Sequence, residues 1–600
     1  MQQRLSSTLA VALLLQSVLA QYDPVANFCK RLDHQSAIVN GKLYIDGGRE
    51  VFTNYAPNGT DIGPHIIGPN EYLLSLDLTK GWSASDPLPI ITITKNTSTP
   101  FLSRGALFPK GDGSDNFFLF GGTVAYDNKT FANFQLPQPE GNPIIGYGGA
   151  ADSWSLMPET ILRACSGSAA VLQDGSKAFY FNGEQDNGSS EESINLLDTT
   201  KFMNGMIEMD LNNPQSSGGV KNLSTSAVSS LARVRGSMVH VPLPGSKGVL
   251  VLLAGGEKSS LDSQHDWKGT LVSMQTVQVF DVGSISASSP DGKWYKQTTS
   301  GVAPSPRLDA CITVMAAPDN SSYNVYMYGG RDGLNAYFDE RTLPSFKWVK
   351  GYSGPNPRYS LTCHVIGPRQ MMTIGGSENS TVTARCDPVT QGIRILDMTL
   401  LNWDVAFNPN VPAYQLPMAV VNVIGGNQSG SANITSPTGG FQQKGLQELF
   451  HPGTTSKDAD PSTNGSSGAG SSSKKKTPVG AIVGVVIGVL VLLAAIAALV
   501  FVLLRRKRQA RQAAMVKDAA AGNEVYEISN GSLPLAATKL PSPAVVHEID
   551  APPPKSELFG DSPMVAEMDA SSRASSARSR AGTVTGGPPT TTTVTVTVTH

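Results

Sequence analysis

The chain has 600 residues and a nearly balanced charge, with 46 Lys and Arg against 48 Asp and Glu and a formal net charge of −2. Without a basic excess to neutralise phosphates, we expect no nucleic-acid partner. Composition alone leaves the molecular partner open.

The N-terminus reads as a secretory signal. Residues 1–20, MQQRLSSTLAVALLLQSVLA, carry one basic residue, Arg4, followed by an apolar run that closes on Val18, Leu19 and Ala20. This small-residue ending is the pattern that signal peptidase accepts, and the apolar run is too short to span a bilayer. We therefore expect cleavage after Ala20.

Residues 21–427 repeat one pattern six times. Each copy has an apolar strand that ends on a glycine pair, with an arginine upstream and, in most copies, a tryptophan downstream. The glycine pairs are Gly47 and Gly48, Gly121 and Gly122, Gly255 and Gly256, Gly329 and Gly330, and Gly375 and Gly376, with Asn182 and Gly183 as a degenerate copy. The arginines are Arg31, Arg104, Arg163, Arg235, Arg307 and Arg358. The tryptophans are Trp82, Trp154, Trp294, Trp348 and Trp403, and the third copy lacks one.

This repeat predicts six four-stranded antiparallel sheets packed radially, because one such sheet cannot bury both of its faces alone. Glycine at the strand ends permits positive φ and a close approach of two backbones. We expect the tryptophans to fill the space between neighbouring sheets.

The pattern resembles the kelch-repeat proteins of the galactose-oxidase-like β-propeller superfamily, and the layout resembles their membrane-anchored fungal cell-surface type. The resemblance covers residues 28–427, where residues 414–427, YQLPMAVVNVIGGN, resemble the strand that ends such ectodomains. It implies an all-β fold, a six-bladed kelch-type β-propeller.

The C-terminal third reads as stalk, membrane span and tail. Residues 428–477 are rich in Ser, Gly, Thr and Asn and are expected to form a flexible stalk. Residues 479–504 contain no charge and no proline and are long enough to cross a bilayer, the alternative being a buried core helix. Basic residues directly after the span predict that residues 505–600 form a disordered cytoplasmic tail that engages cytosolic proteins.

These features predict a single-pass plasma-membrane protein with its N-terminus outside the cell. Gly480, Gly484 and Gly488 form small-residue steps that favour a lateral dimer, although glycine is common in membrane helices anyway. Sequons on the outer side predict a glycan-coated surface. The candidate acceptors are Asn58, Asn96, Asn128, Asn187, Asn222, Asn320, Asn379, Asn427, Asn433 and Asn464.

The five cysteines allow two disulfides with one thiol left over. Cys29 precedes the first repeat and Cys386 follows the glycine pair of the sixth, and these repeats become neighbours when the ring closes. A Cys29–Cys386 disulfide is therefore the candidate pairing. Cys165, Cys311 and Cys363 follow arginines on predicted inner strands, where buried free thiols are expected.

Chain direction predicts one binding face. The arginine-bearing loops and the four longest insertions share that face because successive strands alternate in direction. These insertions are residues 49–69, 123–153, 184–204 and 257–271. The six arginines are the candidate binding residues, and the alternative is that they pair with carboxylates or carbonyls of neighbouring sheets.

The superfamily resemblance also implies copper-radical oxidation as an alternative activity. That chemistry needs two histidines and two tyrosines, one of them bonded to a cysteine, and no ectodomain histidine directly follows a tyrosine. His34, His240 and His364 stand in different registers after their arginines, which favours packed strand residues. We predict no catalytic residue, no metal site and no cofactor.

The resulting interpretation is a glycosylated surface protein whose propeller binds an extracellular protein or glycan. The alternatives are a carbohydrate-directed copper-radical oxidase and a structural link between cell wall and membrane.

Overall fold

The computed structural model describes residues 23–54, 63–96, 99–124, 144–157, 161–196, 200–229, 231–258, 269–332, 338–343, 345–351, 358–378, 381–387, 389–452 and 557–558. These residues belong to one compact unit, residues 1–455 and 554–600. The predicted signal, span, glycine steps of the span and most of the tail lie outside the described residues. Within the described part, no helix is both long and apolar enough to cross a membrane.

In the described part of the chain, six of the seven four-stranded antiparallel sheets follow one another along the sequence. They are β2 (Gln35–Val39), β3 (Lys42–Asp46), β6 (Tyr72–Asp77) and β7 (Ile91–Thr94); β8 (Ser103–Pro109), β9 (Phe117–Thr123), β10 (Ile144–Gly148) and β11 (Ser153–Met157); β12 (Ser168–Val171), β13 (Lys177–Phe181), β16 (Met206–Asp210) and β17 (Val220–Leu223); β19 (Ser237–Val241), β20 (Val249–Leu253), β23 (Thr276–Asp281) and β24 (Lys293–Thr298); β25 (Leu308–Ala316), β26 (Tyr323–Arg331), β27 (Phe338–Leu343) and β28 (Lys347–Val349); and β29 (Tyr359–Ile366), β30 (Gln370–Ser377), β31 (Ile393–Asp397) and β32 (Asn402–Asp404). Each predicted repeat therefore corresponds to one of these sheets.

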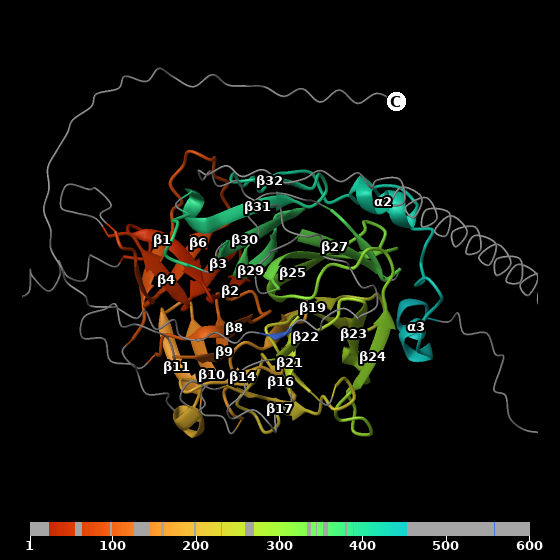
Figure 1. Cartoon of the computed structure of the whole chain (residues 1–600), viewed down its shortest axis with the longest axis horizontal. Coiled ribbons are helices and arrows are strands. Elements are labelled where there is room, and N and C mark those ends of the chain that lie inside the picture. Colours follow the sequence, from red (N-terminus) through yellow and green to blue (C-terminus); the bar gives the residue numbers. More distant parts are fainter. Residues whose placement is uncertain are drawn as a thin grey trace, which may run out of the picture. The chain divides into compact units, whose positions relative to one another are not determined.

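The first strands of the sheets form a closed cycle. Strand β2 contacts β8, and the contacts continue through β12, β19, β25 and β29 back to β2. In Figure 1 the red strands at the start of the chain accordingly lie beside the green strands β29 and β30 of the last sheet. The start of the repeat region thus meets its end.

The apolar core lies between neighbouring sheets. Tyr44 of the first sheet packs with Phe117 of the second, and Phe179 of the third packs with Phe280 of the fourth. The second strands are apolar and buried along their length, as in the sequence VLVLL of β20. Such continuous burial arises when both faces of a strand are covered. Trp403 of the sixth sheet also contacts a neighbour, with its ring 4.7 Å from that of Tyr328 in the fifth.

The glycine pairs connect each sheet to the next. In each case a backbone N–H at the end of the second strand donates to a carbonyl that precedes the next first strand. The donor–acceptor pairs are Gly48–Leu102, Gly122–Ala164, Gly183–Arg233, Gly255–Arg307 and Gly330–Arg358. The residue before the donor has positive φ, as in Gly121 at 71°. In the fourth sheet this residue is Ala254 at 59°, so the pair that acts there is Ala254 and Gly255, not the predicted Gly255 and Gly256.

The predicted long loops form a second layer of short strands at the arginine-bearing face. Three of the four insertions supply hairpins there, and two of these hairpins pair with a strand that precedes a first strand. The members are β1 (Phe28–Leu32) with β4 (Arg49–Phe52) and β5 (Ile66–Pro69); β14 (Glu184–Gln185) with β15 (Lys201–Phe202); and β18 (Ala232–Val234) with β21 (Gly256–Lys258), β22 (Gly269–Leu271) and β33 (Glu557–Leu558). The described connections also contain the short 3-10 turns η2 (Glu191–Leu196), η3 (Val282–Ser284) and η4 (Val389–Gly392).

The seam between the first and last sheets is closed by a disulfide and by a backbone bridge. Cys29 on β1 is bonded to Cys386, with their Cα atoms 4.4 Å apart. Trp82 and Phe407 exchange two backbone hydrogen bonds of 3.0 Å, and their rings lie 5.0 Å apart. The indole Nε1 of Trp82 also donates to the carbonyl of Val405 at 2.9 Å.

The predictions of a terminal strand at residues 414–427 and of a flexible stalk directly after it are wrong, because each of these segments contains a helix. Residues 418–424 form α2 (Met418–Ile424), which ends at Gly425 with φ 76°. Residues 428–452 pack on the sheets and contain α3 (Lys444–Phe450), whose Leu446 is buried in the core between the fourth and fifth sheets. The folded domain therefore continues about one helix beyond the predicted boundary at residue 427.

Candidate functional site

Six residues in the left-handed conformation mark where the first strands begin. They are Asp33, Arg104, Ser166, Arg235, Asp309 and Ser360, with φ between 54° and 58°. Their backbones are linked in sequence around the cycle. The N–H to carbonyl pairs are Asp33 to Ser360, Arg104 to Asp33, Ser166 to Arg104, Arg235 to Ser166 and Asp309 to Arg235, at 2.8–3.2 Å. This inner ring brings the backbones of six residues from different sheets next to one another.

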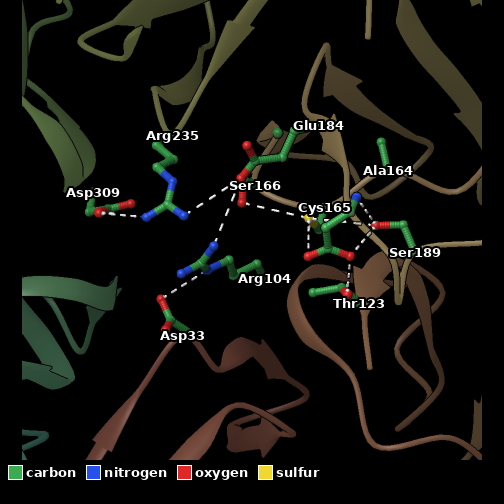
Figure 2. Close-up of polar contacts among 12 residues, drawn as sticks. Asp33, Arg104, Thr123, Ala164, Cys165, Ser166, Glu184, Ser189, Arg235 and Asp309 are labelled. Atoms are coloured by element: carbon green, nitrogen blue, oxygen red, sulfur yellow. Dashed lines mark hydrogen bonds and ion pairs between the residues drawn. The ribbon is translucent and has the colours of Figure 1, made fainter. Parts of the chain in front are cut away.

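Charged side chains of the inner ring form a continuous chain of ion pairs, which we call the central ion-pair chain. Arg104 lies 3.3 Å from Asp33 and 3.8 Å from Glu184 of β14. Arg235 lies 3.6 Å from the same Glu184 and 3.4 Å from Asp309. Figure 2 shows both guanidinium groups directed at Glu184, so one carboxylate joins the second, third and fourth sheets.

Two further arginines extend this chain at its ends. Arg49 of β4 pairs with Asp33 at 2.5 Å, and Arg331 of β26 pairs with Asp309 at 3.1 Å. The side chains of Arg49 and Arg331 are 25% and 24% exposed, whereas the three carboxylates are 3–11% exposed. The central ion-pair chain thus contains four guanidinium groups and three carboxylates, and its most accessible members are both cationic.

The six predicted arginines fall into two structural sets. Arg104 and Arg235 belong to the inner ring. Arg31, Arg163, Arg307 and Arg358 lie two or three residues before it and are almost fully buried. Arg307 donates to the carbonyl of Gly329 and Arg358 to that of Gly375, each in the second strand of its own sheet. These buried arginines hold strands together and are not accessible to a ligand.

A buried polar cluster adjoins the central ion-pair chain in the third sheet. The carboxylate of Asp186 accepts hydrogen bonds from the hydroxyls of Thr123 at 2.5 Å and Ser189 at 2.9 Å. The thiol of Cys165 lies 3.9 Å from the other oxygen of the Asp186 carboxylate. Burial raises the pKa of Asp186, and it raises the pKa of the Cys165 thiol well above its usual value. Cys165 is therefore a protonated, buried thiol with no nucleophilic character at neutral pH.

Two of the three candidate histidines meet at the seam. His34 Nε2 lies 2.9 Å from Thr362 Oγ1, which lies 2.5 Å from Ser36 Oγ, which in turn lies 2.7 Å from His364 Nε2. His240 is remote from them, between the carbonyl of Lys247 and a neighbouring turn. Burial lowers the pKa of His34 to about 3, helped by Arg31, and burial lowers the pKa of His364 to about 4.

This histidine pair predicts a loss of stability in acid. Both pKa values lie below the ordinary 6.5, so the unfolded chain takes up protons first as pH falls below 6.5. Stability should be complete above pH 6.5 and fall progressively toward pH 3–4. Replacing His34 with Gln should flatten the decline by roughly 2 kcal/mol between pH 6.5 and 4.5 in urea unfolding of the full chain. Parallel pH profiles for wild type and His34→Gln would contradict this account.

The predictions for the cysteines are right in part. The Cys29–Cys386 pairing is present, and Cys165 is a buried free thiol. Cys311 and Cys363, predicted as free thiols, instead form a disulfide between the fifth and sixth sheets. They occupy adjacent first strands, β25 and β29, just after inner-ring residues, so their side chains meet. The sixth sheet is thereby bonded to both of its neighbours.

The described sequons lie at the surface. The side chains of Asn96, Asn222, Asn320, Asn427 and Asn433 are exposed, and Asn187 is half-buried. Asn58, Asn128, Asn379 and Asn464 lie outside the described residues. Exposure at these positions leaves room for a glycan but does not establish one.

Sequence reasoning missed Asp33, Glu184, Asp309, Arg49 and Arg331. A signal was present, because the sequence Arg-Leu-Asp occurs at residues 31–33 and again at 307–309, and Arg-Val-Arg occurs at 233–235. A charged residue two positions after the buried arginine is the inner-ring position. Arg233, which was also missed, occupies the buried position of the fourth sheet and pairs with Glu257 at 3.0 Å.

An architecture of mostly β-sheet with few helices, with sheets in a closed cycle, is consistent with a kelch β-propeller. No family model matches the chain. A kelch repeat-containing protein of Arthroderma benhamiae is 27% identical over 468 residues, which cover 68% of this chain and 65% of that protein. The chain thus spans just under two thirds of that relative's length. The similarity supports a relationship to kelch-repeat proteins.

The chain also aligns with a solved structure described as "Structure of YjhT". The TM-score is 0.40 and the identity 13%, over 64% of this chain and 100% of that one. Values this low carry no argument about fold or function.

Proposed function

We propose that the chain is a glycosylated, single-pass cell-surface protein whose six-bladed kelch propeller binds an extracellular protein or glycan bearing acidic groups. The proposal rests on the central ion-pair chain, in which four guanidinium groups pair with three carboxylates. The kelch-repeat relative supports a binding role over a catalytic one.

The central ion-pair chain is costly to bury, and its two ends are accessible from solvent. Charged groups withdrawn from water are costly, and packed apolar residues often stabilise a fold at least as well. Seven charges held in one chain at the centre of the cycle are therefore better explained by recognition than by stability. At its two most accessible ends, Asp33 and Asp309 hold the guanidinium groups of Arg49 and Arg331 in place, and guanidinium groups suit carboxylate or phosphate ligands.

The hairpins around the inner ring also support the arginine-bearing face as the binding face. Strands β4 and β5 and strands β21 and β22 rise beside the inner ring and would form the walls of a binding surface. The membrane span, the glycans and the contacts of the tail with cytosolic proteins remain proposals from the sequence. A structural link between cell wall and membrane is the alternative to this binding role.

Binding can be tested with full-length protein on an array of neutral and uronic-acid-bearing glycans and of immobilised secreted proteins. The double variant Arg49→Gln/Arg331→Gln should weaken binding to acidic targets by roughly tenfold or more, as expected for loss of two charge-assisted contacts. Binding of the wild type should also weaken as salt rises, because these groups are partly exposed.

The matched control is Arg369→Gln. Arg369 lies in the turn between β29 and β30, on the opposite face, and pairs with Asp397 at 2.7 Å. It carries the same kind of ion pair without lying at the inner ring. If Arg369→Gln removes binding and the double variant retains it, the proposed face is wrong.

A further inference from the structure

Two sulfurs and an imidazole converge at the seam between the first and last sheets. Cys29 lies on β1, His65 directly precedes β5, and Cys386 lies between β30 and η4. His65 Nδ1 is 3.7 Å from both sulfurs, and His65 Nε2 is 3.5 Å from Cys386 Sγ. Within the described ranges, these three residues form a group whose potential ligand atoms all lie within 4.8 Å of one another.

We propose that these three residues form a site with two states, a disulfide when oxidised and a Cys2His site for Zn²⁺ when reduced. In tetrahedral zinc sites the Zn–S and Zn–N bonds of about 2.3 and 2.0–2.1 Å place sulfur and nitrogen ligands about 3.5–3.6 Å apart. The separation of His65 Nε2 and Cys386 Sγ already has this value. The two sulfurs must separate, to about 3.8 Å in the same geometry, and the imidazole must turn so that Nε2 faces both of them.

A hydrogen bond of His65 supports this assignment. Its Nδ1 lies 2.9 Å from the carbonyl oxygen of Thr383, to which it can only donate. That hydrogen bond places the ring proton on Nδ1 and makes Nε2 the nitrogen that can coordinate a metal ion. A ring N–H donated to a backbone carbonyl is the usual support of a metal-binding histidine.

The seam does not depend on the disulfide alone. The backbone N–H of Asp387 donates to the carbonyl of Cys29 at 2.7 Å, and the Asp387 carboxylate pairs with Arg358 and Arg394. These contacts keep residues 29 and 386 adjacent after the sulfur–sulfur bond is broken. Cys29 is buried, whereas His65 and Cys386 are half-buried, so a reductant and an ion can approach from the Cys386 side.

A dithiol can carry out the reduction step by thiol–disulfide exchange. Its thiolate attacks Cys386 Sγ and forms a mixed disulfide, while Cys29 leaves as a thiolate and takes up a proton. The second thiol of the reductant then closes its own disulfide and releases Cys386. Binding of Zn²⁺ displaces the two thiol protons and gives a site with no net charge.

The site can be tested by anaerobic titration of the purified full chain with Co²⁺, a spectroscopic substitute for Zn²⁺. After phosphine reduction, we expect one Co²⁺ per chain, with thiolate-to-cobalt absorption and tetrahedral d–d bands that Zn²⁺ abolishes. The oxidised chain should show neither. His65→Ala should weaken binding by at least about tenfold, the loss seen even for outer partners of metal ligands.

Two controls separate this site from other thiols. Cys29→Ser/Cys386→Ser leaves the Cys311 and Cys363 thiols available after reduction and should show no cobalt bands. His451→Ala, which alters a half-buried histidine elsewhere, should bind like wild type. The proposal is overturned by absence of bands in the reduced chain, by equal bands in Cys29→Ser/Cys386→Ser, or by equal affinity in His65→Ala.

A second measurement does not depend on cobalt spectra. One equivalent of Zn²⁺ should slow alkylation of Cys29 and Cys386 by iodoacetamide in the reduced chain, as followed by mass spectrometry. Alkylation of Cys311 and Cys363 should be unaffected. Equal protection of all four thiols, or of none, would count against the site even if reduction loosens the fold.

Discussion

Replacing Gly121 with alanine should destabilise the full chain by about 2–5 kcal/mol, whereas the same change at Gly113 should cost only about 1–2 kcal/mol. Gly121 lies on β9 and Gly113 in the turn between β8 and β9, and the two have nearly equal positive φ, 71° and 76°. A Cβ on Gly121 would lie 2.4 Å from the carbonyl oxygen of Ala164 in the third sheet, and a Cβ on Gly113 would meet nothing within 4 Å. Both substitutions therefore carry the cost of an alanine at positive φ, and only Gly121→Ala adds a steric clash.

The measurement is urea unfolding of the purified full chain with its disulfides intact, followed by tryptophan fluorescence. The larger loss at Gly121 has a definite cause, because Gly122 donates its N–H to that same Ala164 carbonyl at 2.9 Å. A Cβ would force the two sheets apart and weaken this connection. Equal losses for Gly121→Ala and Gly113→Ala would show that the glycine pair serves only backbone conformation.

The repeat and its glycine pairs could be predicted because they are local and periodic. Each sheet needs its own strand ends, so the same residue types recur at similar spacing. Asn182 takes the left-handed position in the third sheet with φ 51°, which is why a degenerate copy was still recognisable. The closed cycle follows from the number and order of these copies.

The central ion-pair chain could not be predicted, because it depends on an offset of two or three residues. Arg104 and Arg235 were grouped with Arg31 by their distance from the glycine pair. That distance varies enough along the sequence to hide whether an arginine is at the inner ring or just before it. Arg235 reaches Glu184 and Asp309, which lie far away in sequence, only once three sheets are placed.

The C-terminal corrections have a similar origin. The sequence ending in Gly425 and Gly426 resembled the strand that ends on a glycine pair, but a glycine with positive φ ends a helix equally well. A short apolar run does not by itself distinguish helix from strand. In residues 428–452 the average composition is polar, and a few side chains such as Phe441 and Leu446 are enough to hold the segment to the sheets.

Breaking the ion pair between Arg31 and Glu50 should be the most damaging single change at the arginine-bearing face. The two residues face each other on β1 and β4, with Arg31 Nη2 2.9 Å from Glu50 Oε1 and both side chains fully buried. Arg31→Met would leave Glu50 buried without its cation, and this should lower the free energy of unfolding by about 3–5 kcal/mol. Urea unfolding of the full chain at pH 8 measures the loss.

The fourth sheet offers a matched control. Arg233 and Glu257 face each other on β18 and β21 in the same way, but the side chain of Glu257 is 20% exposed. After Arg233→Met, Glu257 can still reach water, so the cost should be smaller, about 1–2 kcal/mol. A larger loss at Arg233 than at Arg31 would contradict burial of the remaining carboxylate as the cause.

Two further results follow from the same pair. Burial raises the pKa of Glu50 to about 7 against its ordinary 4.5, although Arg31 opposes the rise. The unfolded chain is therefore ionised first, and the stability contribution of this group is lost as pH rises from 4.5 through 7. Without Arg31 the carboxyl is still harder to ionise, so Arg31→Met should lose less stability at pH 5 than at pH 8.

The double variant Arg31→Met/Glu50→Leu buries no charge at all and should recover most of the loss at both pH values. If the double variant is as unstable as Arg31→Met at pH 8, the penalty comes from lost packing of the long side chain and not from an unpaired buried carboxylate.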